Sequence, residues 1–279
     1  MRLTSGPPRI SSTLTPSLAP MFYQLEITTR CNFDCFYCAG RDMPQQDMSW
    51  DTFIRIIDRI PGQGSVVSLQ CEGETSLHPK FEAMGQHVAT RGHQAYTILN
   101  ESRVDAERLS RLFPTIGVSV DTLNEQLAQD IGRHNLPKVL RNIELLCQAM
   151  DPKRITITTV NMGQPLDDLR RWVKLRGFGQ HIVHQLSPKS DYPRRYTVNS
   201  QLVLPSGPST CRYLQRQLMR FYTWEGQELP CCFMKNSSDF TTRQQLGARL
   251  ASGLLRICCA GCPQLVREER AVSLWPEML

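Results

Sequence analysis

Three cysteines on one short segment constrain this chain more than any other feature. Cys31, Cys35 and Cys38 are separated by three residues and then by two. An iron–sulfur cube has four iron corners that four cysteines usually hold, so three cysteines leave one iron without a protein ligand. That iron can bind a substrate or cofactor, as a catalytic zinc keeps one position open. A zinc knuckle is the alternative, but it usually pairs CxxC with a second CxxC or HxxxH, and neither lies beside this segment.

The bulk properties exclude several classes of protein. The 279 residues suffice for one α/β barrel or two small domains. The net charge of +6 is scattered, which favours a solvated surface over nucleic-acid binding. We expect neither a nucleic-acid nor a membrane partner, because apolar runs are shorter than a membrane span.

The first 20 residues are rich in Ser, Thr and Pro and lack the apolar core of a secretion signal. We interpret residues 1–20 as a disordered tail, with a transit peptide as the alternative. Since 11 cysteines in such a chain do not suggest a secreted disulfide scaffold, we expect a cytoplasmic protein whose thiols bind metal.

Short apolar runs alternate with helical periodicity from residue 22 onward. Six strands with helices between them predict an α/β fold, in which parallel strands joined by right-handed crossovers form a barrel or an open wound sheet. The predicted strands are Phe22–Thr28, Ser65–Cys71, Gln94–Leu99, Thr115–Val120, Arg154–Val160 and Gln180–Leu186. The predicted helices are Trp50–Ile60 with Ser49 as its N-cap, Lys80–Arg91, Asp105–Leu112, Pro137–Met150 and Leu166–Leu175, which Gly177 ends.

Polar residues gather where the predicted strands end. In barrels the chemistry lies at the C-terminal ends of the strands, so these side chains should share one rim. The residues at the six successive strand ends are the three-cysteine loop, then Glu72-Gly73-Glu74, Asn100, Ser119 with Asp121, Asn161, and Gln185 with Ser187.

With these motifs the chain resembles the radical S-adenosylmethionine (radical SAM) superfamily over most of residues 22–187. The resemblance implies that Cys31, Cys35 and Cys38 hold a 4Fe–4S cluster whose open iron is chelated by SAM. It also implies the activity: the reduced cluster cleaves SAM to methionine and a 5′-deoxyadenosyl radical, which removes a hydrogen atom from the substrate.

The resemblance assigns further residues to SAM. Tyr37 would pack near the adenine, with plain loop packing as the alternative. Gly73 would let the backbone approach SAM, and Glu74 would accept hydrogen bonds from its ammonium group. The motif departs from the family at Glu72, where a glycine is common, and at Thr75, where proline is common.

Later strand ends add weaker assignments. Ser119 would bond the SAM ribose, and Asp121 would either assist it or cap the next turn. Leu99-Asn100-Glu101 stands where the family usually has Thr-Asn-Gly, so Asn100 is the one residue of this motif that matches. Arg133 lies where some relatives bind the SAM carboxylate, although we favour a surface arginine, and Asn161 would line the adenine pocket.

The C-terminal cysteines form a second set. The spacing Cys211, fourteen residues, Gly226, four residues, Cys231 resembles the opening of a SPASM/twitch domain, and Cys259 and Cys262 supply two more thiolates. The resemblance implies a second, auxiliary 4Fe–4S cluster, while a zinc ion with four thiolates is the alternative. Cys258 competes with Cys259 as a ligand, and the two-residue spacing favours Cys259.

The expected fold is therefore a partial (βα)6 barrel with a small twitch-like domain of hairpin and helix. We divide the chain into a tail (1–20), a radical SAM core barrel (21–190), and a linker with the auxiliary cluster domain (191–279). Within the last part we predict a hairpin across Glu225-Gly226 and a helix over Arg243–Gly253.

The resemblance favours dehydrogenation of a small polar or sugar-like substrate, with the auxiliary cluster taking an electron from the substrate radical. Flavodoxin or ferredoxin would supply the first electron. Alternatives are an epimerase, with Cys71, Cys232 or Cys258 as hydrogen donor, a maturase of a ribosomally made peptide, and a structural metal-binding protein. Cys147 lies on an apolar helix face and is expected in the core.

Overall fold

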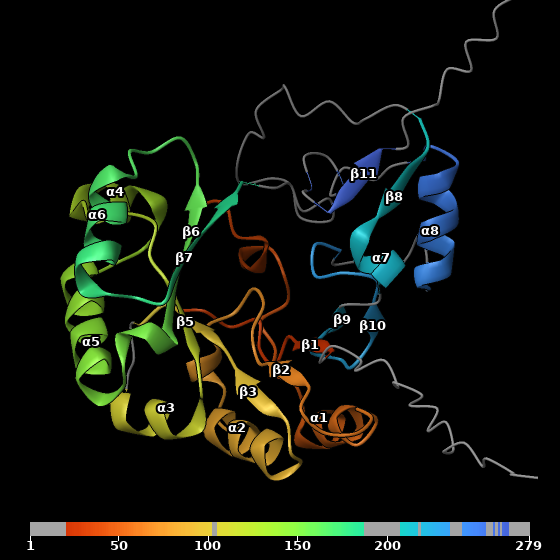
Figure 1. The fold of residues 1–279 in the computed structure, drawn as a ribbon, viewed down its shortest axis with the longest axis horizontal. Helices are drawn as coiled ribbons and strands as arrows, with labels where there is room; N and C mark the ends of the chain where they lie inside the picture. The colour runs from red at the N-terminus through yellow and green to blue at the C-terminus, as the bar shows by residue number, and fades with distance from the viewer. Residues whose placement is uncertain are drawn as a thin grey trace, which may run out of the picture.

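The computed structural model describes residues 21–101, 105–186, 207–216, 219–234, 242–254, 259, 262 and 264–267. It is an α/β fold in which the six predicted strands lie side by side in chain order, each parallel to the next (Figure 1). The strands are β1 (Phe22–Leu25), β2 (Val66–Ser68), β3 (Gln94–Tyr96), β4 (Ile98–Leu99), β5 (Ile116–Ser119), β6 (Ile155–Asn161) and β7 (Gln180–Gln185).

The third predicted strand is divided at Thr97. Its first half, β3, pairs with β2, and its second half, β4, pairs with β5. The Thr97 hydroxyl donates to the Leu69 carbonyl oxygen at 3.1 Å and lies 2.9 Å from the Thr75 hydroxyl. These contacts turn the chain between two sheets, and so let the wall of parallel strands curve.

The helices cover the outer side of this wall (Figure 1). Ser49 caps α1 by accepting a hydrogen bond from the Thr52 amide, and Gly177 ends α6 in the left-handed conformation, as expected. The sequence reading missed α4, although Asn124 caps it and Gly132 ends it. The helices are α1 (Trp50–Ile57), α2 (Phe81–Thr90), α3 (Ala106–Leu112), α4 (Glu125–Ile131), α5 (Leu136–Ala149) and α6 (Asp167–Arg176), with 3-10 turns η1 (Ala39–Arg41), η2 (Thr75–Leu77) and η3 (Pro152–Arg154).

The main core lies between strands and helices. Leu25 and Val67 from the strands pack in one buried cluster with Phe53 of α1 and Met84 of α2. Cys147 packs against the edge of this cluster, as its helical position predicts. Successive residues of a strand point to opposite faces of the sheet. Because Leu25 and Val67 point toward the helices, Gln24 of β1 and Ser68 of β2 lie on the inner face of the curved strand wall.

The C-terminal part returns to the first strand. β9 (Met219–Tyr222) pairs parallel with β1 and antiparallel with β10 (Glu228–Leu229), so the hairpin predicted across Glu225-Gly226 is confirmed. Gly226 has a φ of 85°, and a Cβ there would lie 2.5 Å from the Thr52 side chain. The hairpin therefore turns tightly against α1 and extends the barrel sheet.

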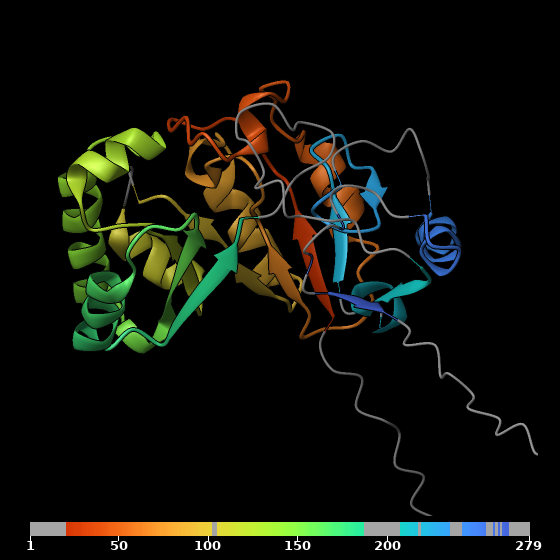
Figure 2. The ribbon, with the colours of Figure 1, turned by 90° about the horizontal axis from the view of Figure 1, so that it is seen from above.

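A smaller group of elements lies beside this hairpin (Figure 2). It contains β8 (Ser209–Cys211), α7 (Arg212–Arg216), α8 (Arg243–Ala251) and β11 (Leu265–Arg267), with β8 and β11 antiparallel. The predicted helix over Arg243–Gly253 corresponds to α8. Met219, Met234 and Leu246 form a second buried cluster here, against which Phe22 of β1 packs.

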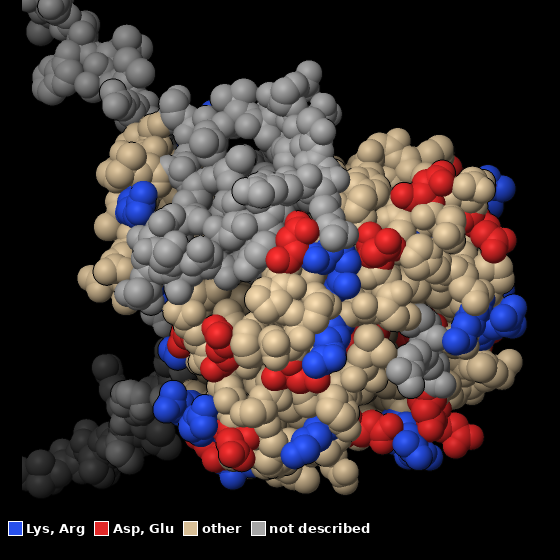
Figure 3. Space-filling model, turned by 180° about the vertical axis from the view of Figure 1, so that it is seen from behind, with Lys and Arg blue, Asp and Glu red and all other residues tan. Residues whose placement is uncertain are grey.

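Some expectations fall outside the described residues, namely the 1–20 tail, the linker from 191 and Cys258. Within the described part of the chain, the helices are too short or too polar to cross a membrane. Lys and Arg alternate with Asp and Glu over the face shown in Figure 3, in agreement with the scattered charge of the sequence.

Candidate active site

The three-cysteine loop is held by the turn between α4 and α5. Backbone amides of Asp34 and Phe36 donate to the carbonyl oxygens of Gly132 and Ile131, at 3.1 and 3.0 Å. Gly132 has a φ of 92°, and a Cβ there would lie 2.6 Å from the Asp34 carbonyl oxygen. The helix α4, which the sequence did not predict, therefore ends at Gly132, and Gly132 anchors the cysteine loop.

The loop thiols suit iron as a ligand set. Cys35 is buried, Cys31 and Cys38 are half-buried, and the described cysteines are free of disulfides. Burial raises the pKa of the Cys31 and Cys35 thiols, so a thiolate here needs a positive partner. Iron supplies that charge, and Phe33 adds the apolar shielding that controls solvent access to a cluster. By number and chemistry these donors therefore fit the 4Fe–4S cluster that the sequence implies, although the described residues include no group of three or more Cys, His, Asp or Glu side chains placed to hold a metal ion in this structure.

Gly73 lets two loops pack closely, and its approach to SAM stays a prediction. A Cβ at Gly73 would lie 2.3 Å from the Thr28 carbonyl oxygen and 2.8 Å from that of Arg30. The side of Gly73 on which a side chain would project therefore faces the backbone that leads into the cysteine loop. The adjacent Glu74 amide donates to the Arg30 carbonyl oxygen at 2.7 Å, so glycine lets the two loops lock together.

Glu74 is a buried carboxylate held from two directions. Oε1 accepts hydrogen bonds from the Ser76 amide at 3.1 Å and the Ser76 hydroxyl at 2.6 Å, while Oε2 accepts from the Asn100 amide at 2.7 Å. Burial raises the pKa of Glu74, and these hydrogen bonds oppose the shift. A carboxylate has about four acceptor positions, and these hydrogen bonds use three of them.

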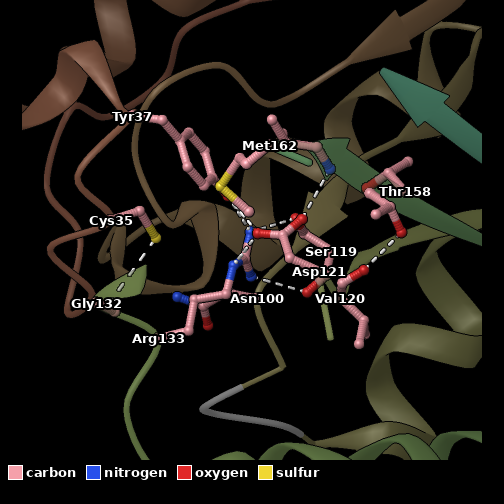
Figure 4. A network of polar contacts seen from close by, with 12 residues as sticks. Cys35, Tyr37, Asn100, Ser119, Val120, Asp121, Gly132, Arg133, Thr158 and Met162 are labelled. Atoms are coloured by element: carbon pink, nitrogen blue, oxygen red, sulfur yellow. Dashed lines mark hydrogen bonds and ion pairs between the residues drawn. The ribbon is translucent and has the colours of Figure 1, made fainter. Parts of the chain in front are cut away.

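Tyr37, Asp121, Arg133 and Ser119 form one polar network (Figure 4). Asp121 Oδ2 accepts from the Tyr37 hydroxyl and from Arg133 Nε, both at 2.6 Å. Arg133 Nη2 also donates to the Tyr37 hydroxyl at 2.8 Å and to the Ser119 hydroxyl at 2.6 Å. The network ties the cysteine loop to the end of β5.

The structure corrects the interpretation of Arg133 as a surface residue. Its side chain is only 12% exposed and pairs with Asp121, whose side chain is fully buried. Asp121 also does more than cap a turn, because its Oδ1 accepts from the Val160 amide at 2.8 Å. The pair thus connects β5 and β6 with the loop before α5.

Asn100 joins the rim, whereas Asn161 lies apart from this network. Asn100 Nδ2 donates to Asn32 Oδ1 at 3.0 Å and lies 3.8 Å from Cys31 Sγ. Asn161 instead bonds with Gln185 at 3.4 Å and with the Gly163 amide at 3.0 Å. Its assignment to the adenine pocket stays a prediction.

A small cavity opens beside the network. It encloses about 250 Å³, including open solvent, and its lining joins Phe33 of the cysteine loop to Ser119 and Arg133. Leu136 and Val139 of α5 supply apolar wall. The cavity places the Ser119 hydroxyl and the Arg133 guanidinium beside apolar surface.

Glu101 carries an unusual carboxyl group behind this rim. It is fully buried with a φ of 56°, a conformation that suits glycine, and within the described structure both carboxyl oxygens lack hydrogen-bond partners. Its backbone is fixed by Asn142 Nδ2, which donates to the Glu101 carbonyl oxygen at 2.6 Å. Burial and the neighbouring Glu74 raise the pKa of Glu101 to about 8.

Glu101 should make the protein less stable as the pH rises. Because its folded pKa is raised, its proton stabilises the fold fully below the ordinary value of about 4.5 and progressively less as pH passes through about 8. We expect the free energy of unfolding to fall by up to about 5 kcal/mol over this range. Urea denaturation from pH 5 to 9 measures it.

Glu101→Gln should flatten this pH dependence and be the more stable protein at pH 8. The matched control is Glu107→Gln on α3, whose side chain is 82% exposed and which should retain the wild-type slope. Equal slopes for wild type and Glu101→Gln would contradict the assignment.

The C-terminal cysteines surround a second cavity. Cys211, Cys231, Cys259 and Cys262 all line it, together with apolar side chains that include Tyr213 and Leu246. It encloses about 400 Å³, open solvent included. Burial, followed by the neighbouring cysteines, raises the pKa of Tyr213 to about 12. The structure therefore brings together the four thiols that the sequence groups as one ligand set.

The chain is similar to several characterised proteins. It is 29% identical over 176 residues to an S-adenosylmethionine-dependent nucleotide dehydratase of Selenomonas ruminantium, covering 54% of this chain and 64% of that protein. It is 27% identical over 184 residues to a GTP 3′,8-cyclase of Saccharophagus degradans, covering 59% and 54% respectively. The chain thus spans less than two thirds of the length of either relative.

Solved structures share the fold at low sequence identity. The structure of BtrN in complex with AdoMet and 2-DOIA matches 88% of this chain and 93% of its own, with a TM-score of 0.53 and 12% identity. Streptococcus suis SuiB bound to precursor peptide SuiA matches 88% of this chain and 72% of its own, with a TM-score of 0.62 and 13% identity. The Radical SAM superfamily model matches residues 25–175, more than half of the chain, and so the chain belongs to the radical SAM superfamily.

Proposed function

We propose that this chain is a radical SAM oxidoreductase with two 4Fe–4S clusters. Cys31, Cys35 and Cys38 hold the first cluster, which supplies the electron that cleaves SAM. Glu74 binds the SAM ammonium group, and Ser119 bonds its ribose. The reaction begins with abstraction of a substrate hydrogen atom and ends in a two-electron oxidation.

The cavity lined by four cysteines is the observation that carries the proposal of oxidation. Its thiols come from three separate segments of the chain, and apolar side chains complete the lining. Four thiolates in a largely apolar shell suit a fully ligated cluster, whose environment sets its reduction potential. Such a cluster can accept the second electron from a substrate radical, which makes the overall change dehydrogenation.

The proposed substrate is small, polar and sugar-like. Two relatives are named for reactions of nucleotides, and these molecules carry a ribose with several C–H bonds next to hydroxyl groups. The inner side of the strand wall agrees with this chemistry, because Gln24 and Ser68 face it beside Tyr96 in one cross-strand row. We propose a reduced flavodoxin or ferredoxin as the electron donor.

The experiment is anaerobic reconstitution followed by reaction with SAM, a low-potential reductant, and candidate nucleosides, nucleotides, sugars and peptides. Two clusters contain about eight irons, whereas one contains about four. We expect one 5′-deoxyadenosine per product and a product two mass units lighter than the substrate. Failure of the reduced protein to cleave SAM would refute the proposal.

Other products would identify other reactions. A product of unchanged mass that gains deuterium from heavy water would indicate epimerisation. Alanine variants of the candidate hydrogen donors Cys71, Cys232 and Cys258 would then be tested. A modified peptide would identify a peptide maturase.

Removing one auxiliary ligand should separate SAM cleavage from oxidation. Cys259→Ala is expected to lower the iron content from about eight to about four. It should still form 5′-deoxyadenosine but lose the oxidised product, because the electron acceptor is gone. Cys147→Ala is the control, since Cys147 is half-buried on α5 and away from the lining of both cavities. Unchanged iron content in Cys259→Ala would contradict the ligand assignment.

A further inference from the structure

Glu72 places a carboxylate beside a sulfur of the cysteine loop. The Cys38 thiol is placed to donate to Glu72 Oε2 at 3.4 Å and to the Glu72 carbonyl oxygen at 3.5 Å. Glu72 Oε1 lies 3.9 Å from Cys71 Sγ. The residue stands where the family motif commonly has glycine, which offers no side chain, so this contact follows from a departure in the sequence of this chain.

The packing around Glu72 fixes the contact. The residue is 6% exposed. A Cβ at Gly40 would lie 2.8 Å from the Glu72 carbonyl oxygen and 2.9 Å from its Cβ. Gly40 belongs to η1, which begins directly after Cys38. The close approach of these two backbones holds the backbone and Cβ of Glu72 against the turn that follows Cys38, and the side chain is buried.

A buried carboxylate at this distance opposes reduction of a cluster. A thiolate that binds iron has released its proton, so the carboxylate faces a negatively charged ligand. Adding an electron to the cluster increases the negative charge beside it. The repulsion is strong because few water molecules screen a buried charge. The net charge around a cluster is one of the factors that set its reduction potential.

We propose that Glu72 lowers the reduction potential of the SAM-cleaving cluster. The proposal rests on the proposed function, in which Cys38 is a ligand of that cluster. A lower potential makes the reduced cluster a stronger electron donor to SAM. Glu72 acts through the Cys38 sulfur and is therefore a positioning residue that tunes the cluster.

The test is a redox titration of the reconstituted protein, monitored by electron paramagnetic resonance at fixed pH. The signal of the SAM-cleaving cluster is the one that changes when SAM is added. Glu72→Gln is expected to shift its midpoint to a more positive potential. Glu72→Asp, whose carboxylate is withdrawn by one methylene group, should shift it in the same direction by a smaller amount.

Asp34→Asn is the matched control, because it removes a carboxylate from the cysteine loop itself. The Asp34 side chain is 63% exposed and pairs with His134, so its charge is screened and the midpoint should stay unchanged. If Glu72→Gln fails to assemble its cluster, Glu72→Asp carries the test alone. An unchanged or more negative midpoint in the assembled variant overturns the proposal.

Iron and sulfide content distinguish this failure from failure of the proposed function. A protein that assembles both clusters and cleaves SAM, but whose midpoint is insensitive to Glu72, refutes only the tuning role. A wild-type protein without the first cluster refutes the ligand assignment itself.

Discussion

Cys35→Ala should abolish cleavage of SAM. Cys35 is the most deeply buried of the three loop cysteines, and the backbone on both sides of it is held by the turn at Gly132. Loss of this ligand leaves two thiolates, too few to hold a cluster that keeps one iron open for SAM. We expect 5′-deoxyadenosine to fall below detection and the iron content to drop from about eight to about four.

The measurement combines iron and sulfide analysis with chromatography of the SAM products. Cys147→Ala again serves as the control and should retain both clusters and full cleavage. The auxiliary cluster should survive in Cys35→Ala, because its proposed ligands line a separate cavity. Retention of eight irons together with SAM cleavage would show that Cys35 is not a ligand.

Arg133→Leu should have the second largest effect, because it leaves the Asp121 carboxylate buried without its charged partner. Breaking a buried ion pair by removing one member costs about 3 to 5 kcal/mol of stability. The same change frees the hydroxyls of Tyr37 and Ser119 from their donor. Because the Ser119 hydroxyl that is proposed to bond the ribose loses the donor that orients it, we expect SAM affinity to fall by about fivefold, the equivalent of one ordinary hydrogen bond of about 1 kcal/mol.

Urea denaturation and equilibrium dialysis with SAM measure these two effects. Arg133→Lys keeps the charge but loses the planar group that contacts three partners, so it should recover part of the stability and little of the affinity. Arg111→Leu on α3 is the control, because its side chain is 68% exposed. Arg133→Leu with wild-type stability and affinity would contradict the role of the network.

The strand wall and the grouping of the cysteines into a loop set and a C-terminal set could be predicted from sequence because their signals are local; that these sets bind clusters stays a prediction. Alternating apolar runs placed β1, β2, β5 and β6, and motif spacing placed the loop thiols. The same reading missed α4, although its Asn124 cap and terminal Gly132 are recognisable. Seven residues of weak apolar periodicity gave too little signal without attention to those caps.

Features that depend on distant contacts could not be predicted. The hydrogen bond from Arg133 to the Tyr37 hydroxyl joins residues 96 positions apart, and the sequence of either residue says nothing of the other. The close approach of Gly73 to the Thr28 carbonyl is likewise a property of two loops packed together. The pairing of β9 with β1 is non-local in the same way, because Met219 lies opposite Phe22.

That pairing has a consequence for synthesis of the chain. β1 keeps one edge open until almost two hundred further residues, up to β9, have been made. Contacts of such sequence separation close slowly, and an open strand edge invites pairing with other chains. The cysteine loop is therefore translated long before β9 closes the sheet beside it, and it is made while the sheet is still incomplete.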